Sequence, residues 1–97
     1  MPDPFTIRIF VPDGDPEGVR LIDRMNWTGI GIAFPRTHLA EVRNRSELAG
    51  AGVYVLVGYS DADDDLPTVY VGQADHVGRR LEQHDADKEF WDWGIAF

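Results

Sequence analysis

The sequence contains no cysteine, and its nine basic residues include a single lysine. Without cysteine, disulfide scaffolds, thiolate zinc sites and cysteine nucleophiles are excluded. The chain also has no apolar run near the roughly 20 residues that cross a bilayer, and no basic stretch precedes an apolar one at its N-terminus. We therefore expect a cytoplasmic protein without membrane contact. The 97 residues, 43% of them hydrophobic, suffice for one small domain.

Acidic residues outnumber basic ones by 17 to 9, which gives a formal net charge of -8. This charge argues against indiscriminate binding to nucleic acid, whose affinity comes mainly from neutralised phosphates. Any DNA partner would need a local patch of basic side chains. The preference for arginine and aspartate fits adaptation to high salt and fits codon bias toward arginine equally well.

The beginning of the chain is predicted to form a strand followed by a helix. Residues 5–11 alternate between apolar and polar and end in the turn "PDGD", which is typical of a strand. Asp15 before Pro16 resembles a helix start, and apolar residues recur at helical spacing from Val19 to about Trp27.

A second strand and a second helix are predicted to complete residues 1–49. The stretch "TGIGIAF" places alternate apolar residues on one face of a strand. The following "PRTHLAEVRNRSELAG" indicates a short helix with Thr37 as its cap and Gly50 at its stop.

Two apolar segments of the second half are predicted to pair as an antiparallel hairpin. They are "GVYVLVGY" and "TVYVG", joined by the acidic turn "SDADDDLP". Tyr54 and Tyr70 have the same parity, so an even register sum places both rings on one face of the pair. The valines then pack on the other face. The acidic turn lacks the glycine and glutamate of a calcium loop, and we predict no metal ligand within the chain.

The segment after residue 72 is predicted to be a helix with one buried stripe. Asp75 can cap it, and Val77, Leu81 and His84 follow at spacings of four and three. Gly78 costs a helix about 1 kcal/mol relative to alanine, which indicates close packing against a strand.

Two arginines of this helix are expected to differ in direction. Arg80 lies four residues before His84, so both lie beside the apolar stripe and are aimed toward the tyrosine hairpin. Arg79 turns toward solvent.

These residues together resemble the GIY-YIG nuclease domain family. Its two strand motifs appear as Gly52-Val53-Tyr54 and Tyr70-Val71-Gly72, with valine in place of isoleucine. An arginine eight residues after the second motif matches Arg80, and a histidine four residues later, found in some members, matches His84. The resemblance implies an α+β fold with a small, mainly antiparallel sheet flanked by helices.

The resemblance also implies metal-dependent hydrolysis of a DNA phosphodiester bond. Tyr54 would act as general base, Tyr70 would form hydrogen bonds in the same site, and Arg80 would contact the scissile phosphate. His84 would be a secondary polar partner. Candidates for further DNA contacts are Gln73, where several relatives carry lysine, Arg79 and Lys88.

In the family, a glutamate of a later helix holds the Mg²⁺ or Mn²⁺, and Glu82 and Glu89 come too early in the pattern to replace it. We therefore expect residues 50–97 to be a nuclease-like domain that is incomplete at its C-terminus. Residues 1–49 would be an N-terminal strand-helix-strand-helix extension.

Two alternatives remain open beside an endonuclease. The chain could be a catalytically inactive DNA-binding or scaffold module of the same fold. It could also be a protein-interaction module in which "FWDWGIAF" forms an exposed apolar edge for self-association, with Trp91 and Trp93 as anchors.

Overall fold

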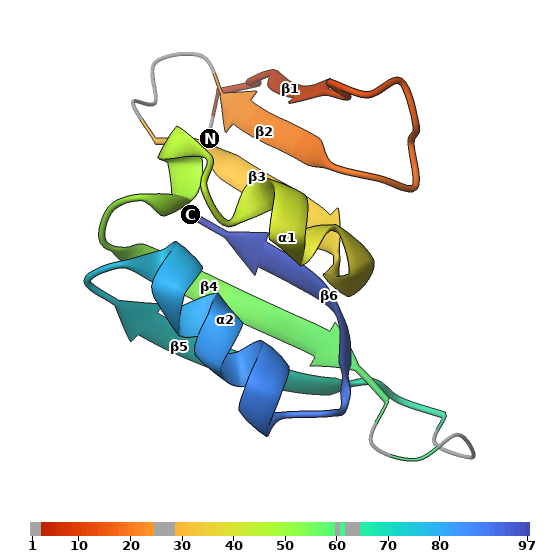
Figure 1. Ribbon diagram of the computed structural model, residues 1–97. Helices are drawn as coiled ribbons and strands as arrows, with labels where there is room; N and C mark the ends of the chain where they lie inside the picture. The colour runs from red at the N-terminus through yellow and green to blue at the C-terminus, as the bar shows by residue number, and fades with distance from the viewer. Residues whose placement is uncertain (1–2, 25–28, 60, 62–64) are drawn as a thin grey trace.

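The computed structural model describes residues 3–24, 29–59, 61 and 65–97, which form a six-stranded sheet with helices beside it (Figure 1). The strand order is β1-β2-β3-β6-β4-β5, and all neighbouring strands are antiparallel. The strands are β1 (Ile7–Phe10), β2 (Arg20–Arg24), β3 (Gly31–Pro35), β4 (Gly52–Gly58), β5 (Thr68–Ala74) and β6 (Trp91–Ala96). The helical elements are η1 (Arg36–His38), α1 (Leu39–Val42), η2 (Ser46–Leu48) and α2 (Val77–Asp87). The predicted α+β fold class is confirmed.

The helix predicted to begin at Pro16 is wrong, because the chain turns there and continues as strand β2. The N–H of Gly18 donates to the carbonyl oxygen of Asp15 at 2.9 Å. Aspartate, proline and glycine at positions one, two and four are typical of a type I turn. The turn returns the chain alongside β1, with Ile9 opposite Ile22. The end of the predicted helix, residues 25–27, lies outside the described residues.

The second predicted strand is confirmed as β3, whereas the second predicted helix is broken into η1, α1 and η2. Thr37 lies within η1, and no side chain caps η1 or α1, so its predicted capping role is wrong. The break allows Leu48 to be buried together with Leu39 and Val42.

Helix α2 buries the predicted stripe of Val77, Leu81 and His84. Its N-terminal cap is His76, whose ring accepts the backbone N–H of Arg79 at 3.2 Å, so the prediction that Asp75 caps the helix is wrong.

Gly78 marks a close approach of α2 to the segment after α1. A Cβ atom at this position would lie 2.6 Å from the carbonyl oxygen of Arg43 and 3.2 Å from that of Leu48. The predicted close packing is therefore present, but its partner is this segment and not a strand.

The predicted exposed C-terminal edge is wrong, because β6 is an inner strand. It pairs with β3 on one side and with β4 on the other. Trp91 is fully buried. The pairing of β3 with β6 also joins residues 1–49 and 50–97 in one sheet.

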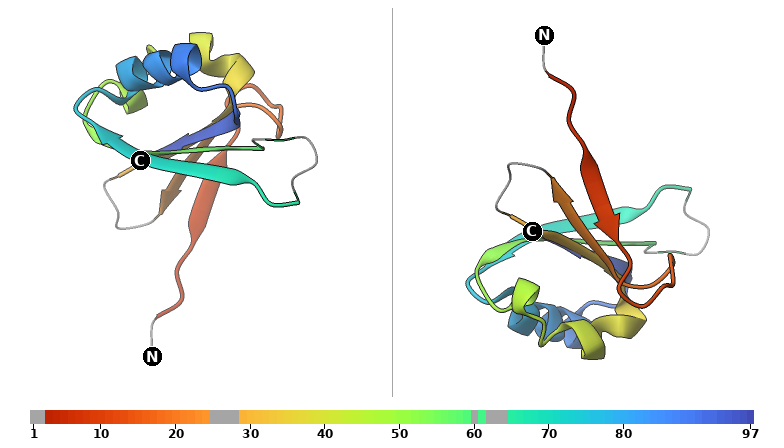
Figure 2. Two further views of the ribbon diagram at one scale, coloured as in Figure 1. Left: turned by 90° about the horizontal axis from the view of Figure 1, so that it is seen from below. Right: turned by 90° about the horizontal axis from the view of Figure 1, so that it is seen from above.

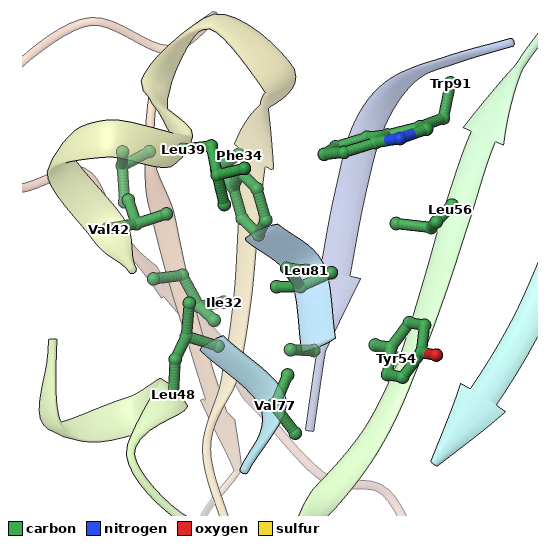
Figure 3. Close-up of a cluster of buried hydrophobic side chains, with 12 residues drawn as sticks. Ile32, Phe34, Leu39, Val42, Leu48, Tyr54, Leu56, Val77, Leu81 and Trp91 are labelled. Atoms are coloured by element: carbon green, nitrogen blue, oxygen red, sulfur yellow. The ribbon is translucent and has the colours of Figure 1, made fainter. Parts of the chain in front are cut away.

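The helices lie on one face of the sheet, and that face carries the core (Figure 2). Figure 3 shows buried side chains from the helices packed against β3, β4 and β6. Tyr54 belongs to this core, whereas Val53, Val69 and Val71 on the opposite face are 43%, 53% and 64% exposed. The prediction that the valines pack is therefore wrong for these three residues, since the helices cover the tyrosine face.

No helix in the described part of the chain is long and apolar enough to cross a membrane.

Candidate active site between β4, β5 and α2

The two motif tyrosines lie on the same face of the hairpin, as predicted. Tyr54 is opposite Gly72 and Leu56 is opposite Tyr70, so the residue numbers of each opposed pair add up to an even number. Residues of equal parity on the two strands therefore share a face. The centroids of the two tyrosine rings are 6.3 Å apart. A Cβ atom at residue 72 would collide with the hydroxyl end of Tyr54, so the glycine of the second motif makes room for that side chain. In Figure 3 the hydroxyl of Tyr54 points toward β5.

His84 completes a cluster of three rings. Its Nε2 atom lies 2.7 Å from the hydroxyl oxygen of Tyr54, within hydrogen-bond distance. Its ring centroid lies 5.4 Å from that of Tyr54 and 5.2 Å from that of Tyr70. Helix α2 places His84 there because Val77 and Leu81, on the same stripe, are buried in the core.

Burial keeps both hydrogen-bonded groups neutral near pH 7. Desolvation raises the pKa of Tyr54, Tyr70 raises it further, and the positive charge of Arg80 lowers it in part. Desolvation lowers the pKa of His84, and the charges of Lys88 and Arg80 lower it further. A phenol and a neutral imidazole therefore face one another.

Arg80 lines a surface depression of about 500 Å³. Gln73, also a candidate for DNA contact, lines the same depression with residues 51–53, Ala74 and Asp75. Within the described ranges, Arg80 is exposed and makes no ion pair or side-chain hydrogen bond. Its guanidinium is therefore available to an anion that enters the depression.

The other two predicted DNA-contact residues lie apart from this depression. The Nζ atom of Lys88 lies 4.5 Å from the centroid of Tyr70, at the far end of α2. Arg79 is exposed and does not line the depression. The structure thus brings Tyr54, Tyr70 and His84 together, places Arg80 beside them and separates Arg79.

Sequence reasoning missed Arg36, which anchors the C-terminal end of α2. Its guanidinium donates to the carboxylate and the backbone carbonyl of Asp85, each at 2.7 Å. It also donates to the carbonyl oxygens of Glu89 and Trp91 and lies 4.7 Å from the centroid of the Trp91 ring. Its partners lie about 50 residues along the chain, so no local pattern could have identified them.

The residues present do not fit the metal that the resemblance implies. Among the residues that the structure describes, no group of three or more histidine, aspartate or glutamate side chains could hold a metal ion. The polar groups around Tyr54 are a second phenol, an imidazole and a guanidinium, and none is a carboxylate ligand of the kind Mg²⁺ prefers.

No protein-family model, curated protein or solved structure matches this chain. The ring cluster of Tyr54, Tyr70 and His84, with Arg80 beside it, is therefore the feature that bears on function.

Proposed function

We propose that this chain is the phosphodiester-contacting part of a DNA endonuclease. The observation that carries the proposal is the hydrogen bond between Tyr54 and His84, beside Tyr70 and the unpaired Arg80. These four residues come from two strands and a helix, and they are the residues that match the motifs of the GIY-YIG family. The complete enzyme would use Mg²⁺ or Mn²⁺, and its location would be cytoplasmic.

The Tyr54–His84 pair can move a proton away from an attacking water. Tyr54 is protonated at pH 7, so it can accept a proton only while giving up its own. Nε2 of neutral His84 lies 2.7 Å from the hydroxyl and can take that proton. The water proton then passes to the tyrosine oxygen, the hydroxide oxygen bonds to phosphorus, and His84 becomes an imidazolium. The leaving alkoxide oxygen carries away the electron pair of the broken P–O bond.

Arg80 would bind the phosphate that is attacked. A planar guanidinium presents paired N–H donors that match phosphate oxygens and stabilises the negative charge that grows in the transition state. Gln73 offers an amide donor in the same depression. Neither Tyr54 nor His84 lines the depression, and Arg80 is the link between the depression and these rings, since its positive charge lowers the pKa of both.

A catalytically inactive DNA-binding module is the second candidate, and the burial of Tyr54 favours it. The side chain is only 1% exposed, and its raised pKa opposes ionisation. In this function Tyr54 and His84 hold α2 on the hairpin, and Arg80 still binds a backbone phosphate. The two candidates differ in whether the hydroxyl of Tyr54 takes part in chemistry.

The test is plasmid nicking in Mg²⁺ and in Mn²⁺ by the full gene product that contains these 97 residues. Tyr54→Phe and Arg80→Ala should each reduce nicking by about 100-fold or more, since general bases and transition-state donors contribute effects of this size. The matched control is Arg8→Ala, which also removes one positive charge but lies on β1.

Loss of nicking in both variants, with Arg8→Ala active, would support the endonuclease. A folded gene product that does not nick plasmid DNA would contradict the endonuclease proposal. Fluorescence anisotropy with a labelled DNA duplex would then test the binding module. Weaker binding by Arg80→Ala than by Arg8→Ala would support that module, and equal affinities would reject it.

A further inference from the structure

The sheet face opposite the helices is apolar across β3, β6, β4 and β5 and carries Arg20 on β2. By register, one row runs from Arg20 through Ala33, Ile95 and Val55 to Val71. The neighbouring row contains Trp93, Val57 and Val69. An antiparallel sheet with one solvated face normally carries polar residues at such positions. Figure 2 shows no helix of the described chain on this side.

One part of this open face is hollowed, and another part carries exposed valines. A hollow of about 400 Å³ lies over the strands from β1 to β4 in sheet order, and it is lined by Ile9, Arg20, Ile22, Ala33, Val57, Trp93 and Ile95. Its lining is almost entirely apolar. On the other part, Val53, Val69 and Val71 of β4 and β5 are 43%, 53% and 64% exposed. Strand β6 contributes to the hollow and is the neighbour of β4.

We propose that this open face is the interface of a homodimer with a two-fold axis near β6. Rotation about such an axis brings the valines of β4 and β5 over the hollow of the second copy. Each copy then supplies a hollow and also the valines that enter the hollow of the other copy, as an isologous interface requires. Two twisted sheets pack in this way about 10 Å apart.

The polar chemistry of Arg20 also suits this arrangement. Its Nε atom is buried and has no hydrogen-bond partner within the described residues. Its guanidinium lies 4.4 Å from the centroid of the Trp93 ring. The Nε atom is already covered within the single copy, so a group of the second copy would pair with the terminal nitrogens of this guanidinium. The proposed axis places Arg20 near β5 of the second copy, which is an edge strand in the described sheet.

The size of the face is sufficient for a small dimer interface. Five strands spaced about 4.8 Å apart, with a rise of about 3.3 Å per residue, give a footprint of roughly 24 by 20 Å. Protruding side chains give this face more accessible surface than its projected area. The accessible surface therefore approaches the roughly 600 Å² per partner that the smaller specific interfaces bury. We expect dissociation in the micromolar range, as for other small interfaces. The negative charge does not oppose the contact locally, because these two rows carry Arg20 and no acidic residue.

Sedimentation velocity of the 97-residue chain from about 1 to 100 μM tests the proposal. We expect a dimer of twice 10.9 kDa at the upper concentrations. Val71→Lys should weaken dimerisation at least 100-fold, because the interface would bury an unpaired ammonium. Leu66→Lys is the matched control, since this residue is 78% exposed in the connection between β4 and β5 and lies outside the face.

Far-UV circular dichroism of each variant shows whether the fold is kept. A wild-type chain that stays monomeric at 100 μM would assign the face to another occupant and overturn the dimer. A folded Val71→Lys variant that dimerises like the wild type would also overturn it, as would open-ended association without a defined dimer.

Arg20→Met keeps most of the side-chain volume and should weaken dimerisation about tenfold, because it removes a donor in the interface. Unchanged affinity would contradict the two-fold orientation.

Discussion

The hydroxyl oxygen of Tyr54 lies 2.7 Å from Nε2 of His84, which links β4 to α2 across 30 residues of sequence. Tyr54 is 1% exposed and His84 is 8% exposed, so the contact is formed away from water. Each group therefore takes the place of water as the hydrogen-bonding partner of the other.

Replacing Tyr54 with phenylalanine should destabilise the fold as well as affect nicking. The variant keeps the ring but leaves a buried imidazole nitrogen without its partner, which costs about 1–2 kcal/mol. Urea denaturation measures the change in the free energy of unfolding. Tyr59→Phe is the control, because Tyr59 is 50% exposed and its variant should differ from the wild type by less than about 0.5 kcal/mol. Equal effects in the two variants would show that the Tyr54 hydroxyl adds no stability.

The stability of the protein should decrease as the pH falls below the ordinary pKa of histidine, about 6.5. The pKa of His84 is lowered in the folded state, so the unfolded chain binds a proton that the folded chain does not. The free energy of unfolding therefore decreases with decreasing pH in this window. Measurements should stop near pH 5, since the lowered pKa of Glu47 adds a further loss in stronger acid.

His84→Gln should flatten this slope between pH 7 and about pH 5. His38→Gln removes a histidine from η1, outside the ring cluster, and should keep the wild-type slope. The decisive quantity is the slope and not the absolute stability, because His84→Gln also changes the packing. A slope that survives in His84→Gln would assign the pH dependence to another group.

Replacing Gly78 with alanine should destabilise the protein although it improves helix propensity. In an exposed helix this change stabilises by about 1 kcal/mol. Here the new Cβ atom would lie 2.6 Å from the carbonyl oxygen of Arg43, and such overpacking costs about 1–3 kcal/mol. Gln83→Ala, at an exposed position of α2, should be neutral within about 0.5 kcal/mol. Thermal melting of both variants tests the sign, and a raised melting temperature in Gly78→Ala would contradict the close approach.

Replacing Arg36 with lysine should cost about 1–3 kcal/mol, because lysine cannot reproduce a fork that serves several acceptors. The acceptors are the carboxylate of Asp85 and backbone carbonyls at the end of α2 and the start of β6. Arg8→Lys is the control, since Arg8 also contacts an aspartate through two nitrogens, but its side chain is 73% exposed. We expect a much smaller loss there, because solvent screens the exposed pair. Equal losses in chemical denaturation would show that the backbone contacts of Arg36 add nothing.

The residues of the candidate site were predictable because they lie in one local unit. The hairpin and the helix that follows it span residues 52–87, and their patterns depend on periodicities of two and about 3.6. Equal parity placed Tyr54 and Tyr70 on one face on the condition of an even register sum, which the structure has, and helical spacing placed His84 on the buried stripe. The burial of the Tyr54 hydroxyl against His84 was not predictable, since it depends on how far α2 approaches the sheet.

The errors of prediction fall where one local signal serves two structures. Asp15 and Pro16 suit the start of a helix and equally a type I turn, and pairing with β1 selected the turn. The apolar run of β6 suits an exposed edge or an inner strand, and pairing with β3 made it an inner strand.

Local contacts specify the hairpin, the equal parity of its tyrosines and the stripe of α2, because these features involve residues close in the chain. Long-range strand pairing instead places β6 between β3 and β4, and the packing of the helices selects the tyrosine face. Both strand faces of "GVYVLVG" are apolar, so the local pattern does not distinguish them. The choice depends on long-range packing, which buries Tyr54 and leaves Val53 and Val71 exposed.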